Sequence, residues 1–545
     1  MTIRFLKRAS ASIGAIASWR SAMGRSEGLV TTRQNLKSAG NPDRTYRSQS
    51  SRTQSNKMEK LITMRSIRYL AALMVATAAT PAFADSSMDA GPVTVTLGGF
   101  LAFEGIYRSR NENSDMGSQF NAVPFSSSPY GHLSETRFSA RQSRLTVMAQ
   151  GDVNSDTHLT FWNEMDFLGA AQTANSNQSN SYNLRIRNMY TTIDWDSLGL
   201  QLLAGQNWSL AAANTKGITP RNELVPTTID AQYVVGFVWA RQPQLRITKN
   251  WNKEFWAAVS IENPQTTVAG NTIALPTGIT NDVTRVGASQ FNSANSLSFN
   301  HIPDVIGKLA WEPVIDGAQP LHVEVYGIYR DYYDRTFYAA GNVLGYPVGN
   351  QNADRAGVSV GGTITYNVIP KTLDVQFTGS QGTATGRYGS GGLSDVTYRP
   401  DGTLAPIQET TLMAGGTWHV DPLLDIYAYG GQEAQHRRLF NVGGPNLAGG
   451  VGNPTLNEAA CIAGDTAAVT NNGCGANVEA ENQISAGFWW RAYQGKFGSF
   501  RFGMQYSYTK VLPFSGVNGA TATSPYLHTS TDDSMIFTSI RYYPF

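Results

Sequence analysis

The chain has 545 residues, of which 15% are charged and 11% aromatic, and it contains 53 glycines. Its mean hydropathy of −0.26 excludes a protein built from many membrane-spanning helices. Residues 85–545 hold 28 basic and 37 acidic side chains, a formal net charge of −9, which argues against nucleic acid as a partner.

The first 57 residues are not expected to belong to the folded domain. They carry 11 Lys and Arg but only two acids, Glu27 and Asp43, and they are rich in serine. We interpret residues 1–57 as an over-extended start or a disordered leader, and a targeting segment is the alternative.

Residues 58–84 have the features of a secretory signal peptide. Arg65 and Arg68 precede the apolar stretch LAALMVATAA, and a small-residue pattern ends at Ala84. A membrane anchor is the alternative, but the apolar run is shorter than the roughly 20 residues that span a bilayer. Cleavage near Ala84 would leave residues 85–545 as one domain.

Alternation with a period of two dominates that domain. In THLTFWNEMDF, Leu159 and Phe161 share one face, whereas Glu164 and Asp166 share the other, as in a strand between unlike environments. Most such stretches have the ~9–11 residues that a tilted strand needs to cross a bilayer. Sixteen are predicted, at 93–107, 137–150, 157–167, 184–195, 199–207, 232–248, 254–262, 304–312, 321–330, 356–366, 371–380, 410–420, 424–434, 483–492, 498–509 and 534–543.

Short and long connections alternate without exception between these stretches. An even strand count with tight turns at one end and long loops at the other is typical of outer-membrane barrels. The sequence therefore predicts an all-β fold, a 16-stranded antiparallel transmembrane β-barrel with short periplasmic turns and long external loops. The predicted long loops are 109–136, 169–183, 208–231, 263–303, 331–355, 381–409, 435–482 and 510–533.

Aromatic residues support the barrel. The last strand, SMIFTSIRYYPF, is expected to pair with the first, because a barrel in lipid cannot leave unpaired edges. Its terminal Phe545 resembles the end signal of outer-membrane barrels. Seven tryptophans close to the short turns predict an aromatic girdle on the periplasmic side: Trp195, Trp251, Trp256, Trp311, Trp418, Trp489 and Trp490.

Parity along the strands assigns side chains to the interior, which in a barrel of this size is an aqueous channel. Leu184 and Ile186 would face lipid, so Arg185 and Arg187 would face the lumen; the same reasoning places Arg144 and Arg246 inside. Pro243 suggests a bulge that would turn Arg241 inward as well.

The segments LLAGQNWSL (202–210) and ARQPQLRI (240–247) resemble the DcaP-like group of trimeric Gram-negative porins. The resemblance implies a homotrimer without a cofactor that passes small, often negatively charged solutes such as dicarboxylates. It also implies that the third external loop, residues 208–231, folds inward as a constriction; an ordinary surface loop is the alternative. This loop offers Lys216, Arg221, Glu223 and Asp230.

The predicted function is therefore an outer-membrane porin, a passive channel for small hydrophilic solutes in contact with outer-membrane lipid. An arginine stripe would favour anions; alternatively, the arginines only solvate the wall opposite Glu164 and Asp166. The candidate pore-lining residues are Arg144, Arg185, Arg187, Arg221, Arg241, Arg246, Glu164, Asp166, Lys216 and Glu223.

Enzymatic chemistry is not predicted. Residues 357–361, GVSVG, match a nucleophile motif, but they lie inside a strand pattern rather than at a strand–helix turn. The histidines have no metal-ligand spacing, and Cys461 and Cys474 are expected to form a loop disulfide in an exported chain. A barrel-embedded hydrolase and a receptor or adhesin that uses the long loops remain the alternatives; the second predicts no conductance.

Overall fold

The structure is a computed structural model, and all of its described residues belong to the domain that follows the predicted signal peptide. Among them, no helix has the length and apolar character that crossing a membrane requires. The predicted leader, the signal peptide and Phe545 lie outside the described residues, which are 87–112, 114–169, 176–269, 275–281, 300–315, 317–441, 448–464, 474–519 and 524–544.

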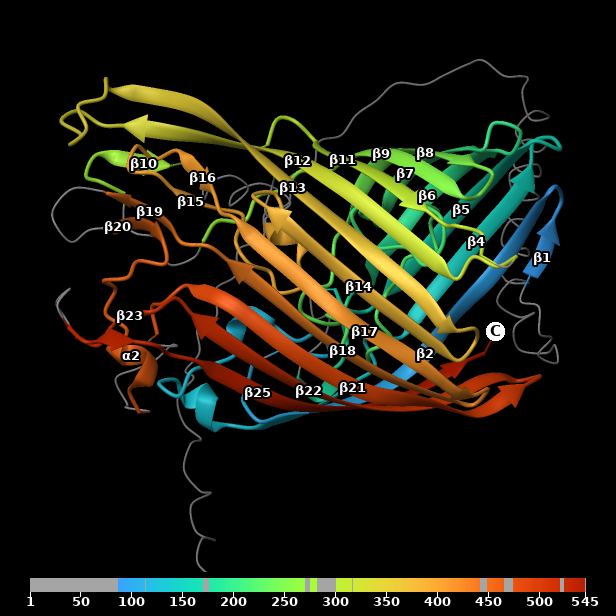
Figure 1. The fold of residues 1–545 in the computed structure, drawn as a ribbon. Helices are drawn as coiled ribbons and strands as arrows, with labels where there is room; N and C mark the ends of the chain where they lie inside the picture. Colours follow the sequence, from blue (N-terminus) through green and yellow to red (C-terminus); the bar gives the residue numbers. More distant parts are fainter. Residues whose placement is uncertain are drawn as a thin grey trace, which may run out of the picture. The chain divides into compact units, whose positions relative to one another are not determined.

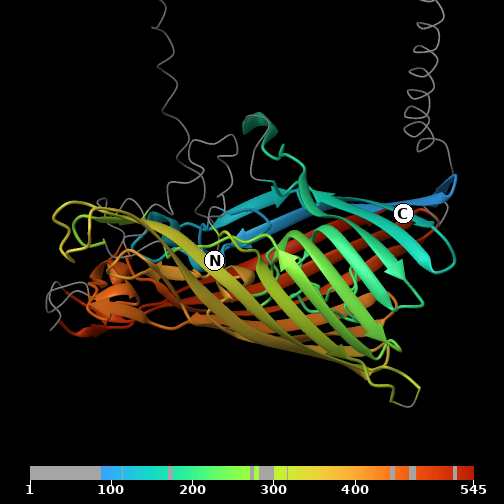
Figure 2. The same ribbon diagram turned by 90° about the horizontal axis from the view of Figure 1, so that it is seen from above.

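Sixteen antiparallel strands form a closed barrel, which confirms the predicted fold class (Figures 1 and 2). The last strand pairs with the first from Leu101 opposite Tyr542 to Arg108 opposite Met535, so no edge is left open. The barrel strands are β2 (Val93–Arg108), β4 (Arg144–Asp152), β5 (Thr157–Asp166), β6 (Arg185–Trp195), β7 (Leu200–Trp208), β8 (Arg241–Trp251), β9 (Phe255–Glu262), β11 (Asp304–Trp311), β12 (Leu321–Tyr338), β13 (Gly349–Ile369), β14 (Leu373–Gly382), β17 (Glu409–Asp421), β18 (Leu424–Gln435), β21 (Val478–Gly495), β22 (Gly498–Pro513) and β25 (Thr531–Tyr543).

Shorter elements precede the barrel strands or lie in the connections between them. They are the strands β1 (Ser87–Ala90), β3 (Glu135–Ser139), β10 (Ile279–Asn281), β15 (Val396–Tyr398), β16 (Leu404–Pro406), β19 (Arg438–Asn441), β20 (Ala448–Val451), β23 (Gly516–Val517) and β24 (Tyr526–Leu527), the helix α2 (Ala459–Ile462), and the 3-10 turns η2 (Phe120–Ala122), η3 (Pro129–His132), η4 (Ser176–Gln178) and η5 (Gly386–Tyr388).

The connections alternate as predicted, so the barrel has a short-turn end and a long-loop end, at the right and left of Figure 1. Three predicted boundaries are wrong. The second strand begins at Arg144 rather than at residue 137, because residues 135–139 form a separate short strand. Residues 331–355 are not simply a loop, because β12 and β13 stay paired from Asp331 opposite Ala356 to Tyr338 opposite Gly349 and project as a hairpin. The sixth strand begins at Arg241 rather than at residue 232, because the preceding segment belongs to an inward-folded loop.

The two faces of the wall differ in polarity. On β13, Val358 and Val360 point outward and are 56% and 64% exposed, whereas Ser359 and Thr363 point inward and are buried. Trp251, Trp311, Trp418 and Trp490 are exposed near the short turns, as a girdle requires. Two other predicted girdle residues, Trp256 and Trp489, are instead buried, and their indole N–H groups bond to Glu312 and to the carbonyl of Thr227.

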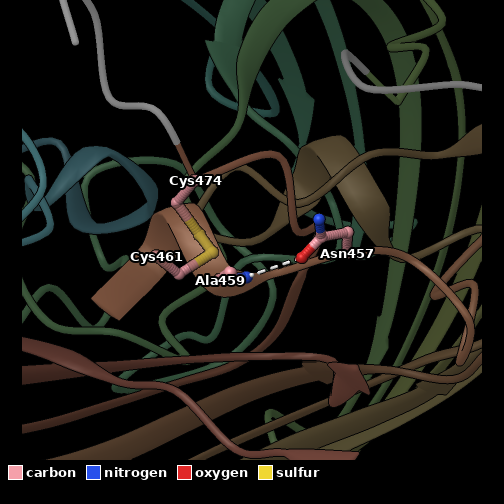
Figure 3. Close-up of a disulfide and its surroundings, with 4 residues drawn as sticks. All are labelled: Asn457, Ala459, Cys461 and Cys474. Carbon is pink, nitrogen blue, oxygen red and sulfur yellow. Dashed lines mark hydrogen bonds between the residues drawn. A yellow bond between two sulfur atoms is a disulfide. The ribbon is translucent and has the colours of Figure 1, made fainter. Parts of the chain in front are cut away.

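A disulfide joins Cys461 of α2 to Cys474, the pairing expected from the sequence (Figure 3). The Asn457 side chain accepts a hydrogen bond of 3.1 Å from the backbone N–H of Ala459 and so orders the start of α2. Both cysteines are buried and pack against Phe125 of another long loop. The disulfide thus anchors the loop between β18 and β21 at the long-loop end.

Candidate channel constriction

The loop between β7 and β8, residues 209–240, folds into the barrel, and we call it the inward loop. Its apolar side chains Leu210, Ile218, Ile229 and Val234 are at most 1% exposed, which an ordinary surface loop would not permit. The inward folding that the resemblance implied is therefore present, and it extends nine residues beyond the predicted loop.

Hydrogen bonds tie the inward loop to opposite parts of the wall. On one side, the Lys308 ammonium donates to the carbonyl of Ala212 at 2.7 Å, and the Gly217 N–H donates to Glu312 at 2.7 Å. On the other side, the Trp489 indole donates to Thr227 O at 2.8 Å, and the Gly236 N–H donates to the Glu433 carboxylate on β18. The loop therefore crosses the interior and narrows it.

A cluster of five charged residues lies on the wall beside this loop, on β4, β5 and β6. The Asp166 carboxylate, which has no exposed surface, accepts hydrogen bonds from Arg185 at 2.8 and 2.9 Å and from Arg187 at 2.9 Å. Glu164 accepts from Arg187 Nε at 2.6 Å and lies 3.6 Å from an Arg144 nitrogen. We call Arg144, Glu164, Asp166, Arg185 and Arg187 the constriction cluster.

The constriction cluster contacts the inward loop directly. Arg187 Nη2 donates to the Tyr233 hydroxyl at 3.2 Å, and Tyr233 packs edge-on against Phe237 with ring centroids 5.1 Å apart. Burial of the hydroxyl raises the pKa of Tyr233, but the positive charges of Arg187 and Arg144 outweigh burial and lower it overall. The loop therefore presents a polarised phenol to the arginines.

Two cavities flank the constriction cluster. One has a volume of about 340 Å³ and lies between the inward loop and the wall, with Arg144, Arg187 and Glu164 on one side and Arg221 and Glu223 on the other. Aromatic side chains complete its lining: Trp162, Tyr190, Trp208 and Tyr233. The second, of about 540 Å³, is lined by Arg185 together with Arg141, Trp239 and residues of the first long loop. The first of these cavities thus brings together five of the predicted site residues: Arg144, Glu164, Arg187, Arg221 and Glu223.

The predicted residues of the inward loop have different surroundings. Arg221 adopts a left-handed backbone conformation with φ of 69°, rare for a residue with a side chain, and its guanidinium lies 5.7 Å from the Trp162 ring. Among the described residues it forms no ion pair. Glu223 accepts from Asn207 at 3.2 Å, and burial raises its pKa, which favours the neutral acid. Lys216 is exposed and lies away from this cavity.

Arg241 and Arg246 both lie near the constriction cluster, but Arg241 is not brought there by the bulge that the sequence predicted. The β7–β8 register runs without a shift from Leu200 opposite Lys249 to Trp208 opposite Arg241, so the predicted bulge at Pro243 is wrong. Arg241 is the first residue of β8, and its guanidinium lies 4.9 and 4.8 Å from the rings of Trp208 and Trp239. Arg246 is buried, and its guanidinium donates to Trp208 O at 2.6 Å.

Several buried ion pairs of the interior were not predicted. Arg541 on β25 pairs with Glu104 at 2.7 Å, and Arg330 on β12 lies between Asp304 and Asp395. Strand parity alone could have found Arg541, because Ile536 and Ile540 point outward on the same strand. Asp304 lies across from Arg330 on the neighbouring strand β11, whereas Asp395 follows no sequence signal, since it reaches Arg330 from the long loop between β14 and β17.

Ser359, the central residue of the nucleophile-like motif, lies inside β13, and its hydroxyl bonds to the backbone N–H of Ala384 and to Thr385. Across the described ranges, no group of His, Cys, Asp or Glu side chains is arranged to hold a metal ion.

No protein-family model matches the chain, and no curated protein matches its sequence. Among solved structures it is similar to the outer membrane channel DcaP of Acinetobacter baumannii, at 16% identity over 85% of this chain and 100% of that chain, with a TM-score of 0.54. An anion-selective porin from Comamonas acidovorans aligns at 12% identity over 83% and 99% of the two chains, with a TM-score of 0.42. The likeness to DcaP shows that this chain has the fold of outer-membrane porins.

Proposed function

We propose that this chain is an outer-membrane porin, a passive diffusion channel for small hydrophilic solutes that prefers anions, dicarboxylates among them. The observation that carries the proposal is the cavity between the inward loop and the wall, where Arg144, Arg187 and Arg221 converge. A closed barrel with an apolar outside suits a bilayer. A loop folded across its interior sets the width of the path, and charges on both sides of that path select among solutes.

The charge balance of the cavity supports anion preference. Glu164 is engaged by Arg187 and Arg144, while Glu223 is held by burial toward its neutral form. Arg221 faces this wall without an acidic partner among the described residues. A solute carboxylate between Arg221 and Arg144 would therefore meet uncompensated positive charge and bidentate hydrogen-bond donors.

We also propose how the chain is exported, processed and assembled. We expect export by the signal peptide of residues 58–84, cleavage near Ala84, loss of residues 1–57 with it, and assembly of the 85–545 domain as a homotrimer, as the resemblance to trimeric porins implies. Mass spectrometry of the mature protein and of the detergent-solubilised assembly tests these points.

Planar-bilayer recording of the folded protein tests the channel. We expect stepwise conductance, with three-step closure for a trimer, and a reversal potential under a salt gradient that indicates anion preference. The double variant Arg185→Ala with Arg187→Ala should reduce that preference. Arg335→Ala, which removes an arginine from the projecting β12–β13 hairpin, is the matched control and should leave it unchanged.

Two outcomes would contradict the proposal. Folded protein without conductance would discard the channel and favour the receptor or adhesin. Cation preference that the double variant does not alter would discard the role of the arginines while leaving the channel intact.

A further inference from the structure

A second group of arginines lies at the long-loop end, apart from the constriction cluster. Three segments meet there: Arg355 comes from β13, Arg399 from the end of β15, and Arg438 from the start of β19. Together with His436 and Arg437 they line a cavity of about 290 Å³. We call Arg355, Arg399 and Arg438 the arginine pocket.

Aromatic rings hold these guanidinium groups in place. Arg399 and Arg438 lie over the same ring, that of Phe440, at 5.6 and 5.4 Å from its centroid. Arg437 lies over Phe514 at 5.0 Å, and its donors bond to Gly452 O and to Ser515. Stacking orients a guanidinium without consuming its N–H groups. Arg437 is therefore a supporting residue, whereas Arg399 and Arg438 keep their donors for a ligand.

The carboxylates that act on these arginines, Asp401 and Asp334, form their hydrogen bonds with other groups. Within the described ranges, none of the three arginines forms an ion pair, and Arg355 donates only to the backbone carbonyl of Asp354. The carboxylate of Asp401 instead accepts from Thr403 N and Oγ1 at 3.0 and 2.8 Å. The three cations line one cavity, and partial burial together with the charges of Arg355 and Arg438 lowers the pKa of Arg399 although Asp401 opposes the shift.

The Nε–H groups of Arg399 and Arg438 are unsatisfied donors among the described residues. Both are shielded from solvent and have no hydrogen-bond partner in the described part of the chain. A shielded donor without an acceptor costs about 1–3 kcal/mol. Three convergent cations, two of them with unsatisfied donors, form an arrangement that recognises a multiply charged anion.

We propose that the arginine pocket binds a tetrahedral oxyanion of the phosphate class. Three guanidinium forks match the oxygens of a phosphate group, whose charge of about −1.5 to −2 at neutral pH balances them better than a single carboxylate would. The group could be a free phosphate or the phosphate of an outer-membrane lipid headgroup. The pocket is separate from the constriction cluster, so the proposal does not depend on the channel.

Calorimetric titration of the folded protein in detergent with inorganic phosphate tests the free-ligand source. Phosphorus analysis of protein incubated with lipid A micelles and then purified tests the lipid source. In at least one arm we expect binding to wild type that weakens at least tenfold in Arg399→Gln with Arg438→Gln. Arg335→Gln is the control and should bind as wild type does.

Heat-modified gel migration establishes that each variant is folded, and Arg355→Gln alone gives a milder second variant, which we expect to weaken binding severalfold. Phosphate binding lost in the double variant would assign the pocket to a free ligand, and lipid A retention lost there would assign it to a headgroup. No binding of either probe by wild type, or binding that neither variant changes, would overturn the proposal.

Discussion

The constriction cluster and the arginine pocket use the same side chain under opposite electrostatic conditions. In the cluster, Arg185 and Arg187 converge on a fully buried Asp166. In the pocket, Arg399 and Arg438 share an aromatic ring and form no ion pair within the described ranges. An arginine that is buried needs a partner within the protein, because an unpaired buried charge costs several kcal/mol. An arginine that remains partly exposed can stay unpaired and accept its partner from solution.

Removing the central acid of the constriction cluster should have the largest effect. Asp166→Asn would leave two arginines around a neutral amide, and we expect a loss of about 3–5 kcal/mol in the free energy of unfolding. The control is Asp196→Asn, whose exposed carboxylate lies 3.3 Å from His158 and should contribute less than about 1 kcal/mol. Denaturant unfolding in lipid measures both. Equal losses would show that burial does not distinguish the two pairs.

Glu112 extends the comparison to a buried acid of the first long loop. Burial raises its pKa to about 7, although Arg108 lies 3.3 Å away. Because its folded-state pKa exceeds the ordinary value of 4.5, ionisation opposes folding, and stability should fall as the pH rises from about 4.5 to 7. Glu112→Gln should remove this dependence and be more stable than wild type at pH 8, by roughly 3 kcal/mol at most.

Thermal unfolding at pH 4.5 and pH 8 measures the effect. At the lower pH the variant and wild type should be alike, since wild-type Glu112 is then protonated in the folded state. Glu254→Gln, at the β8–β9 turn of the opposite end, is the control: it keeps Glu112 and should therefore lose stability between pH 4.5 and pH 8 as wild type does. A variant less stable than wild type at pH 8 would mean that the pair with Arg108 outweighs burial.

Arg221 is the member of the channel site that resembles the arginine pocket, since it too has no acidic partner among the described residues. Arg221→Gly should leave stability unchanged or slightly raised, because glycine adopts a φ of 69° without strain. The permeability ratio of anion to cation, taken from the reversal potential, should fall about two- to threefold. An unchanged ratio would show that the cation of the inward loop does not face the solute path.

The barrel could be predicted from the regular alternation of polar and apolar residues, whereas contacts between segments distant in the sequence could not be predicted. Period two located all sixteen strands, and it placed Arg185 and Arg187 on the face opposite Ile186. It failed at Pro243, because the β7–β8 register passes this residue without a shift. The nitrogen of Pro243 lies on the other side of β8, opposite Asn263, one residue beyond the end of β9, so no strand hydrogen bond is lost there. The arginine pocket carries no local pattern: it exists only because the β12–β13 hairpin and two long loops bring residues 355, 399 and 438 together.

The smallest effect is expected from an acid at the rim of the arginine pocket. Asp401→Asn removes a loop carboxylate that acts on Arg399 but keeps an oxygen that can accept from Thr403. Phosphate should bind roughly twofold more tightly, since an exposed charge in water contributes only a few tenths of a kcal/mol. Asp421→Asn is the matched control, because its carboxylate accepts in the same way from Leu423 and Leu424 at the short-turn end. Since the two substitutions change charge and turn chemistry alike, tighter binding in the first alone would locate the bound anion beside Arg399, and equal affinities in both would place it elsewhere.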